Sequence, residues 1–229
     1  MDSRLICVRR HYYYICIPIK KPKRKVPPDK KGTCCAIDAG VRTFATVYDP
    51  KGEIHEVAGN NNYGLIVRLS HHIDNLQSRI SKATGKAKRK MKHALQRMTF
   101  RIQNLVKDMH NKVANWLCST YETILLPAFE ASKMVTKATR KINSQTVRNM
   151  LSWRHFGLRQ HLSHKAEEMG NNLLIVTEEY TSKTCGECGW LNNSLGGSKI
   201  FHCKECYSKM DRDHNGARNI LLKYLTELM

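Results

Sequence analysis

Four cysteines form the strongest chemical pattern in this sequence. They make two C-x-x-C pairs, separated by fourteen residues: Cys185, Cys188, Cys203 and Cys206. Each pair presents two thiolates about one metal diameter apart, so the two pairs together predict a tetrahedral Zn²⁺ site. Because four thiolates close the coordination sphere, we expect this zinc to be structural and not catalytic.

Carboxylates that follow apolar runs are the second pattern. Asp38 ends the run CCAI, and Glu130 follows ILLPAF. Open α/β sheets hold their sites at the carboxyl ends of strands, so both side chains are candidates for an active site. Alternatives stay open at each position. Asp38 is also compatible with turn initiation or with the phosphate-binding hairpin of actin-like ATPases, and Glu130 with an exposed loop.

Two more aspartates, Asp211 and Asp213, stand where a helical pattern begins. An aspartate at a helix N-cap or in its first turn stabilises the helix by about 0.5–2 kcal/mol, which accounts for one of the two. Three carboxylates at a sheet edge are also what a two-metal nuclease requires. Mg²⁺ prefers oxygen ligands, and two ions about 3.5–4 Å apart activate water and stabilise the leaving oxygen of a phosphodiester.

Positive charge dominates the composition. The chain of 229 residues has a net charge of +20, from 39 Lys+Arg against 19 Asp+Glu. Residues 1–37 hold ten basic and two acidic residues, and residues 65–118 hold twelve and two, so these segments carry eighteen of the twenty charges. Such a charge predicts nucleic acid as the partner, with a merely soluble basic surface as the alternative. The basic tip KAKRKMK offers Lys88, Arg89 and Lys90 as contacts.

The other cysteines and the N-terminal sequence indicate the cellular compartment. The five other cysteines lie in apolar contexts and are expected to be buried thiols: Cys7, Cys16, Cys34, Cys35 and Cys118. The sequence starts without the apolar stretch of a signal peptide, so we expect a reducing intracellular compartment. PKRKV also resembles a nuclear-import signal, although a solvated linker is an equal alternative. No run of about 18 apolar residues occurs, so no membrane span is expected.

The elements that must position these residues follow from periodicity. RLICVRRHYYYICIPIK predicts a long strand or a hairpin, and the proline-containing residues 20–32 predict a basic linker. Residues 33–64 predict a β-meander, and residues 65–118 predict two amphipathic helices joined at Gly85. A strand over ETILL, a long helix closed by Gly170, a strand over NNLLIVTEEY, the cysteine module and a last helix follow. This order predicts an α/β fold, and a ribonuclease-H-like arrangement fits it.

Several stretches, in this order along the chain, are similar to the TnpB/Fanzor family of transposon-encoded nucleases, to which type V CRISPR effectors are related: AIDAGVRTFATV, LLPAFEASKMV, YTSKTCGECG, FHCKEC and DRDHNGARNI. The resemblance covers about residues 33–222. It implies a ribonuclease-H-like RuvC domain in three parts, with a helical-hairpin insertion at 65–118 and an inserted four-cysteine zinc ribbon, the target nucleic-acid-binding region, at 181–209. The three RuvC parts are then residues 33–64, 119–180 and 210–229. Residues 1–32 resemble the last wedge strands and a basic linker.

The resemblance also implies a site. Asp38, Glu130 and Asp213 match the catalytic carboxylates that hold two Mg²⁺ ions, and Asp211 falls outside the triad. Arg218 and Lys183 are candidate nucleic-acid contacts. The implied activity is Mg²⁺-dependent cleavage of DNA, with a single-stranded target and, in the full-length relatives, a guide RNA. Because family members carry longer N-terminal wedge and recognition domains, a truncated and catalytically inert nucleic-acid-binding remnant stays open as the alternative.

Overall fold

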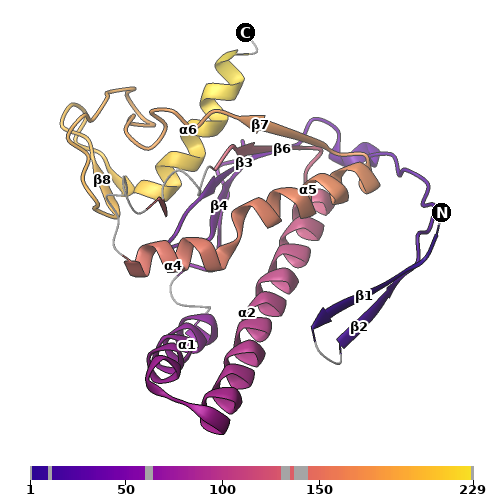
Figure 1. The fold of residues 1–229 in the computed structure, drawn as a ribbon. Coiled ribbons are helices and arrows are strands. Elements are labelled where there is room, and N and C mark those ends of the chain that lie inside the picture. The colour runs from indigo at the N-terminus through magenta and orange to yellow at the C-terminus, as the bar shows by residue number, and fades with distance from the viewer. Residues whose placement is uncertain (1, 10–11, 60–63, 130–134, 137–143, 228–229) are drawn as a thin grey trace.

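A mixed sheet organises the molecule. The computed structural model describes residues 2–9, 12–59, 64–129, 135–136 and 144–227 (Figure 1). Within them, five strands form a sheet in the order β5-β4-β3-β6-β7, with β3 parallel to β6 and β6 parallel to β7. The strands are β3 (Cys34–Ala39), β4 (Ala45–Tyr48), β5 (Ile54–Val57), β6 (Thr123–Pro127) and β7 (Asn172–Val176). The carboxyl ends of β3, β6 and β7 therefore share one edge, while β4 and β5 extend the sheet in antiparallel fashion.

Helices cover both faces of this sheet (Figure 1). The α-helices of the described residues are α1 (Gly64–Lys82), α2 (Gly85–Thr120), α4 (Ser144–Trp153), α5 (His155–Met169) and α6 (Arg212–Glu227). The helices α2 and α5 pack against each other on one face, and α6 packs on the other against β3 and β4. The two helices expected within residues 65–118 are present as α1 and α2, which form a hairpin extending away from the sheet (Figure 1).

Alternation along β3 assigns its side chains to the two faces. Cys35 and Ile37 belong to the large core shared with α2 and α5, whereas Ala36 belongs to the smaller core beneath α6. Successive side chains of a strand point to opposite faces, so Asp38 shares the α6 face with Ala36. One carboxylate thus stands at the end of an otherwise apolar strand, on the side that α6 covers.

The helix expected before Gly170 is divided in two. Gly170 closes α5 in the left-handed conformation, and its N–H donates to the carbonyl of Ala166, as a glycine C-cap does. Arg154, however, adopts φ 50° and separates α4 from α5. The preceding Trp153 is buried and donates its indole N–H to the carbonyl of Val41. Packing of this kind depends on tertiary contacts, so helical periodicity did not reveal the break.

The N-terminal strands form a hairpin that lies apart from the central sheet (Figure 1). β1 (Arg4–Arg9) pairs antiparallel with β2 (Tyr12–Cys16), and Leu5 and Ile15, which pair across it, are 70% and 69% exposed. Cys7 and Cys16 are exposed on this hairpin, so the expectation that they are buried was wrong. A two-stranded ribbon buries little surface by itself, and here Tyr12 contacts Phe100 of α2 with 5.9 Å between the ring centroids.

The linker after the hairpin is held by α5. The backbone N–H of Arg24 donates to the carbonyl of Glu168, and Lys21 and Lys23 form ion pairs with Glu168 and Glu167. Part of the positive charge expected to face a partner is therefore neutralised within the chain. Among the described residues, no helix combines the length and the apolar character needed to cross a membrane.

Candidate carboxylate and metal centre

Asp38 lies directly against the first turns of α6. Its neighbour there is Gly216, and a Cβ atom built at that position would lie 2.5 Å from Asp38 Oδ2. No side chain fits at so short a distance, so the glycine allows the helix to approach the carboxylate. The buried Ile220 and Leu221, farther along α6, pack with Ala36 and hold the helix on the sheet.

The two aspartates at the start of α6 have different surroundings. The helix begins at Arg212, and Asp211 Oδ1 accepts a hydrogen bond of 2.9 Å from the backbone N–H of Asp213. This is the geometry of an N-cap, so the cap expected at this position is provided by Asp211. Asp213 is partly buried in the first turn, and its carboxylate interacts electrostatically with that of Asp38.

Burial and like charges raise the pKa values at this edge. The pKa of Asp38 is raised to about 7, first by burial and then by the charges of Asp213 and Glu178, while Arg212 lowers it. Burial also raises the pKa of Asp213, with a further contribution from Asp211. Carboxylates that repel one another in a partly buried setting favour either a proton or a bound cation.

Glu178 was missed by the sequence analysis. It lies two residues beyond β7 and is partly buried, and burial raises its pKa. Since β3 and β7 run in the same direction, it stands at the same sheet edge as Asp38. The signal that could have found it is the rule applied to Asp38, a carboxylate just beyond an apolar run. Glu130, which the sequence analysis placed in the triad, lies outside the described residues.

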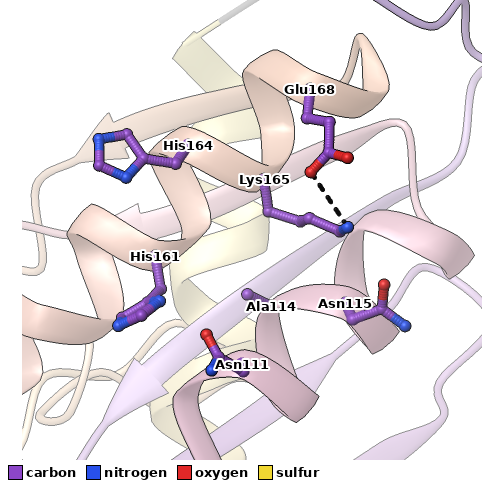
Figure 2. Close-up of a pocket in the computed structure, with 7 residues that line it drawn as sticks. All are labelled: Asn111, Ala114, Asn115, His161, His164, Lys165 and Glu168. Atoms are coloured by element: carbon purple, nitrogen blue, oxygen red, sulfur yellow. Dashed lines mark hydrogen bonds and ion pairs between the residues drawn. The ribbon is translucent and has the colours of Figure 1, made fainter. Parts of the chain in front are cut away.

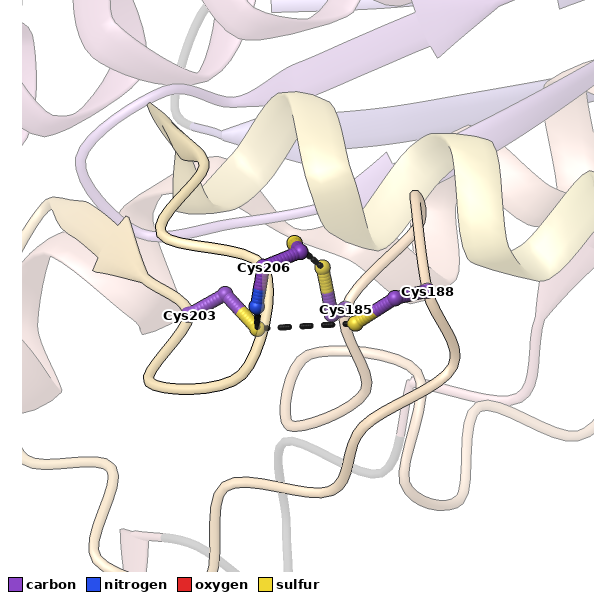
Figure 3. Close-up of side chains that lie close together, drawn as sticks. All are labelled: Cys185, Cys188, Cys203 and Cys206. Carbon is purple, nitrogen blue, oxygen red and sulfur yellow. Dashed lines mark hydrogen bonds between the residues drawn. The ribbon is translucent and has the colours of Figure 1, made fainter.

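The four predicted cysteines come together (Figure 3). Their sulfur atoms all lie within 4.8 Å of one another, with 3.7 Å between Cys185 and Cys206 and 3.6 Å between Cys188 and Cys203. Tetrahedral zinc with Zn–S bonds of about 2.3 Å separates its sulfur ligands by about 3.8 Å. The thiol cluster can therefore bind a metal ion such as zinc without rearrangement.

A small core supports this cluster. Phe201 is fully buried between Cys185 and Cys203, with Trp190 and Met210 packed against it. Trp190 and Phe201 thus pack beside the cysteine knuckles. The strands that carry this core are β8 (Ile200–His202) and β9 (Lys209–Asp211), an antiparallel pair that leads into α6.

Two buried asparagines of α6 anchor the chain that enters the cysteine module. Asn215 accepts the N–H of Gly186 at 2.8 Å and donates to the carbonyl of Thr184 at 2.7 Å. Asn219, one turn later, donates to the carbonyls of Thr181 and Thr184 at 2.8 and 2.7 Å. The same helix that carries Asp213 therefore positions the cysteine module.

The predicted nucleic-acid contacts lie in separate places. Arg218 forms an ion pair with Glu187 of the cysteine module, and Lys183 is exposed. The remaining three are in the first turns of α2, at the end of the helix farthest from the sheet (Figure 1): Lys88, Arg89 and Lys90. The structure does not bring these side chains together with Asp38, and their binding roles stay predictions.

A pocket of about 390 Å³ lies between α2 and α5 (Figure 2). Its polar lining is Asn111, Asn115, His161, His164, Lys165 and Glu168, of which Lys165 and Glu168 form an ion pair of 3.3 Å. Because α2 and α5 cover the face of the sheet opposite to α6, this pocket is separate from the carboxylates.

Comparison with known proteins gives matches along most of the chain. A family model described as "Probable transposase" (OrfB_IS605) matches residues 14–145, and one described as "Cas12f1-like, TNB domain" matches residues 155–220. A TnpB-like protein of Acanthamoeba polyphaga mimivirus is 32% identical over 216 residues, covering 91% of this chain and 40% of the viral protein. The chain thus spans less than half of this relative.

Two further matches concern CRISPR effectors. The CRISPR-associated endodeoxyribonuclease Cas12f1 of Sulfoacidibacillus thermotolerans is 33% identical over 91 residues, covering 39% of this chain and 21% of the bacterial protein. The cryo-EM structure of a Cas12f1–sgRNA–target DNA complex matches with a TM-score of 0.57 at 21% identity, covering 91% of this chain and 52% of that chain. At this identity the structural match shows a shared fold, a mixed α/β arrangement similar to that of Cas12f effectors.

Proposed function

Because this chain belongs to the OrfB_IS605 family of probable transposases, we propose that it is a metal-dependent DNA endonuclease with a RuvC-like, ribonuclease-H-type fold. The order of the sheet supports the fold assignment. A central strand carries the first carboxylate, an antiparallel extension lies on one side and two parallel strands lie on the other. Similarity to an endodeoxyribonuclease supports the class of reaction.

The observation that carries the proposal is the electrostatic interaction of three carboxylates at one edge of the sheet. The three come from segments far apart in the sequence: Asp38 from β3, Asp213 from α6 and Glu178 from the residues after β7. The charges of Asp213 and Glu178 both raise the pKa of Asp38. An arrangement in which burial and repulsion raise carboxylate pKa values is costly for folding, which favours a functional explanation. Gly216 supports the same explanation, because it permits the approach of α6 that brings the carboxylates together.

The donor atoms fit Mg²⁺ or Mn²⁺. Asp38 and Asp213 would hold the ions with a third carboxylate from Glu178 or Glu130, since oxygen ligands suit both metals. When bound, such ions activate water and neutralise charge on a phosphodiester. The cluster of four cysteines would hold one structural Zn²⁺, which keeps the module rigid beside α6.

We infer a single-stranded DNA target and a guide RNA as partners. The Cas12f1 complex similar in fold contains both sgRNA and target DNA. The net charge of +20 supports binding of either nucleic acid. Since the chain spans 40% of its mimivirus relative, RNA guidance by this chain is part of the proposal and is tested separately from cleavage.

The test is cleavage of labelled single-stranded DNA by purified, zinc-loaded protein in Mg²⁺ or Mn²⁺. We expect nicking that chelation of the added Mg²⁺ or Mn²⁺ abolishes. Asp38→Asn and Asp213→Asn should each lower the rate at least about a hundredfold, because each removes a metal ligand. Asp29→Asn, an exposed aspartate outside the cluster, is the matched control. Binding of DNA without cleavage in either metal would support the inert remnant instead.

A pair of variants identifies the third carboxylate. Glu130→Gln and Glu178→Gln are compared in the same cleavage assay. If Glu178 holds the metal, its replacement reduces cleavage to the level of Asp38→Asn while Glu130→Gln retains most activity, and the converse result assigns the role to Glu130. Retention of full activity by both variants would refute a three-carboxylate site.

A further inference from the structure

A second group of potential metal ligands lies beside the carboxylates described above. Glu56 from β5, Asp211 from β9 and His214 from α6 each offer one ligand atom, and these atoms lie within 4.8 Å of one another. His214 Nε2 is 2.9 Å from Glu56 Oε1. All three residues are partly buried, and three separate elements supply them.

The register of the sheet separates this group from Asp38. Thr46 on β4 pairs directly with Asp38 on one side and with Glu56 on the other. Directly opposed residues share a face of the sheet, so these three side chains form one row beneath α6. Adjacent strands lie about 4.8 Å apart, so two strand spacings separate the backbone positions of Glu56 and Asp38 by about 10 Å.

We propose that Glu56, Asp211 and His214 bind a divalent transition-metal ion, Mn²⁺ or Zn²⁺, as a third kind of metal site in this protein. The donor set argues for this class. An imidazole nitrogen suits transition metals better than Mg²⁺, and carboxylate oxygens are ligands of both Mn²⁺ and Zn²⁺. With bonds of about 2.1 Å, ligand atoms around one ion lie about 3–4.2 Å apart, close to the spacing found here.

The hydroxyl of Thr46 is an independent observation that points to a ligand. Thr46 is 1% exposed, and its Oγ1 has no hydrogen-bond partner among the described residues. Buried hydroxyls in native proteins are almost always paired, with protein or with ordered water. Thr46 lies in the row between Asp38 and Glu56, beneath α6, where a water on a metal ion held by Glu56 would provide that partner.

Ion pairing is the competing explanation. Lys199 Nζ lies 3.3 Å from Asp211 Oδ2, and His214 pairs with Glu56. The Lys199 side chain is 41% exposed, so its ammonium can turn into solvent when a metal ion takes its place. Asp211 Oδ1 caps the helix by accepting the N–H of Asp213, which leaves Oδ2 as the ligand atom.

A metal ion at this position would join three parts of the fold. It would connect the edge strand β5, the hairpin that ends the cysteine module and the first turn of α6. Asp213 lies between two of the ligands in the sequence. The ion would therefore fix the start of the helix that carries a proposed catalytic carboxylate, without taking part in cleavage.

The experiment is pulsed electron paramagnetic resonance of Mn²⁺ added to protein that holds one equivalent of Zn²⁺, so that zinc occupies the cysteine cluster and the proposed site is left open to Mn²⁺. The carboxylate cluster offers oxygen ligands, so coupling of Mn²⁺ to a ¹⁴N nucleus reports on a histidine ligand. We expect this coupling in the wild type, with its loss in His214→Gln. Glu56→Gln should weaken Mn²⁺ binding at this site more than about tenfold and lower the number of ions bound by one.

The controls separate the two proposals. Asp38→Asn should keep the ¹⁴N coupling while losing cleavage, so the new site and the nuclease can fail independently. Circular dichroism and thermal unfolding show whether each variant is folded, and Glu56→Gln provides a second test if His214→Gln is not. Absence of ¹⁴N coupling in the wild type, or its persistence in His214→Gln, would overturn the site and leave a network of ion pairs.

Discussion

At the scale of single residues, Asp38 carries the largest electrostatic cost in the candidate site. Its pKa is raised to about 7 by burial and by neighbouring carboxylates, whereas an unfolded aspartate ionises near 3.8. The difference corresponds to at most about 4 kcal/mol of destabilisation once the group is ionised. A bound divalent cation would offset this cost by favouring the ionised form.

Replacement of Asp38 by Asn should therefore stabilise the protein in Mg²⁺-free, zinc-loaded conditions. Between about pH 4 and pH 7 Asp38 is more protonated in the folded protein than in the unfolded chain, so its contribution to the free energy of unfolding falls as pH rises. Asn does not titrate, so the advantage of Asp38→Asn should grow across this range and level off above about pH 7. Urea unfolding at several pH values measures it.

Asp29→Asn serves as the control for this prediction, and its unfolding curve should keep the pH dependence of the wild type. A constant difference between Asp38→Asn and the wild type from pH 4 to pH 8 would contradict the raised pKa.

Local sequence patterns were enough to predict some features of the candidate site. The spacing of the four cysteines predicts that their thiols cluster, because each knuckle is formed by neighbours in the chain. Asp38 follows from its apolar strand, and the cap role of Asp211 from the helix start. The row that joins Asp38, Thr46 and Glu56 could not be predicted, because it depends on the pairing of three strands.

At the scale of elements, α6 combines several tasks in two turns. Asp213 interacts electrostatically with Asp38, and Gly216 allows close approach to the same carboxylate. Asn215 and Asn219 hold the entry to the cysteine module. The sequence patterns predicted this helix and its start. They did not reveal the two asparagines as anchors, because their partners lie 29 to 38 residues away in the sequence.

Gly216→Ala should reduce cleavage more than about tenfold with little change in the secondary structure. The added Cβ would overlap Asp38 Oδ2, so either α6 or the carboxylate must move. The cleavage assay measures the loss, and Gly64→Ala, where a Cβ meets no atom within 4 Å, is the matched control. Cleavage at the rate of the wild type would show that this close approach is not needed.

Asn219→Ala should lower the free energy of unfolding by about 1–3 kcal/mol and accelerate the release of zinc to a chelator. The change removes the donor to two backbone carbonyls, those of Thr181 and Thr184, close to the first cysteine knuckle. Zinc release followed with a colorimetric chelator is the measurement. The control is Asn193→Ala, an exposed position within the cysteine module, and this variant should release zinc at the rate of the wild type.

At the scale of the whole molecule, positive charge and carboxylates are segregated. The segments 1–37 and 65–118 carry most of the net charge, while the carboxylate cluster is built mainly from other parts of the chain. The distribution of charged residues along the sequence was sufficient to predict that positive charge and the candidate carboxylates lie on different segments. It could not predict that Lys21 and Lys23 are paired with α5, because that pairing arises only when the linker folds against the helix.

Replacing Lys88, Arg89 and Lys90 together by Ala should weaken nucleic-acid binding and make it less dependent on salt. Each lost phosphate contact should reduce the slope of log K against log salt concentration by about 0.7–0.9. Fluorescence anisotropy at several salt concentrations measures the slope. The double variant Lys21→Ala and Lys23→Ala should change the slope less for each charge removed, and an equal effect would contradict the proposed role of the tip.

The length of α2 has a mechanical consequence. Its 36 residues correspond to a rod of about 54 Å, whose C-terminal half is buried in the core and whose first turns carry the basic tip. A tilt of about one degree at the buried end displaces the tip by about 1 Å. Small changes in core packing are therefore magnified at the far end of the rod. A fluorescent or spin label on the first turns of α2 would therefore report, as a change in its position, small shifts in packing near the sheet.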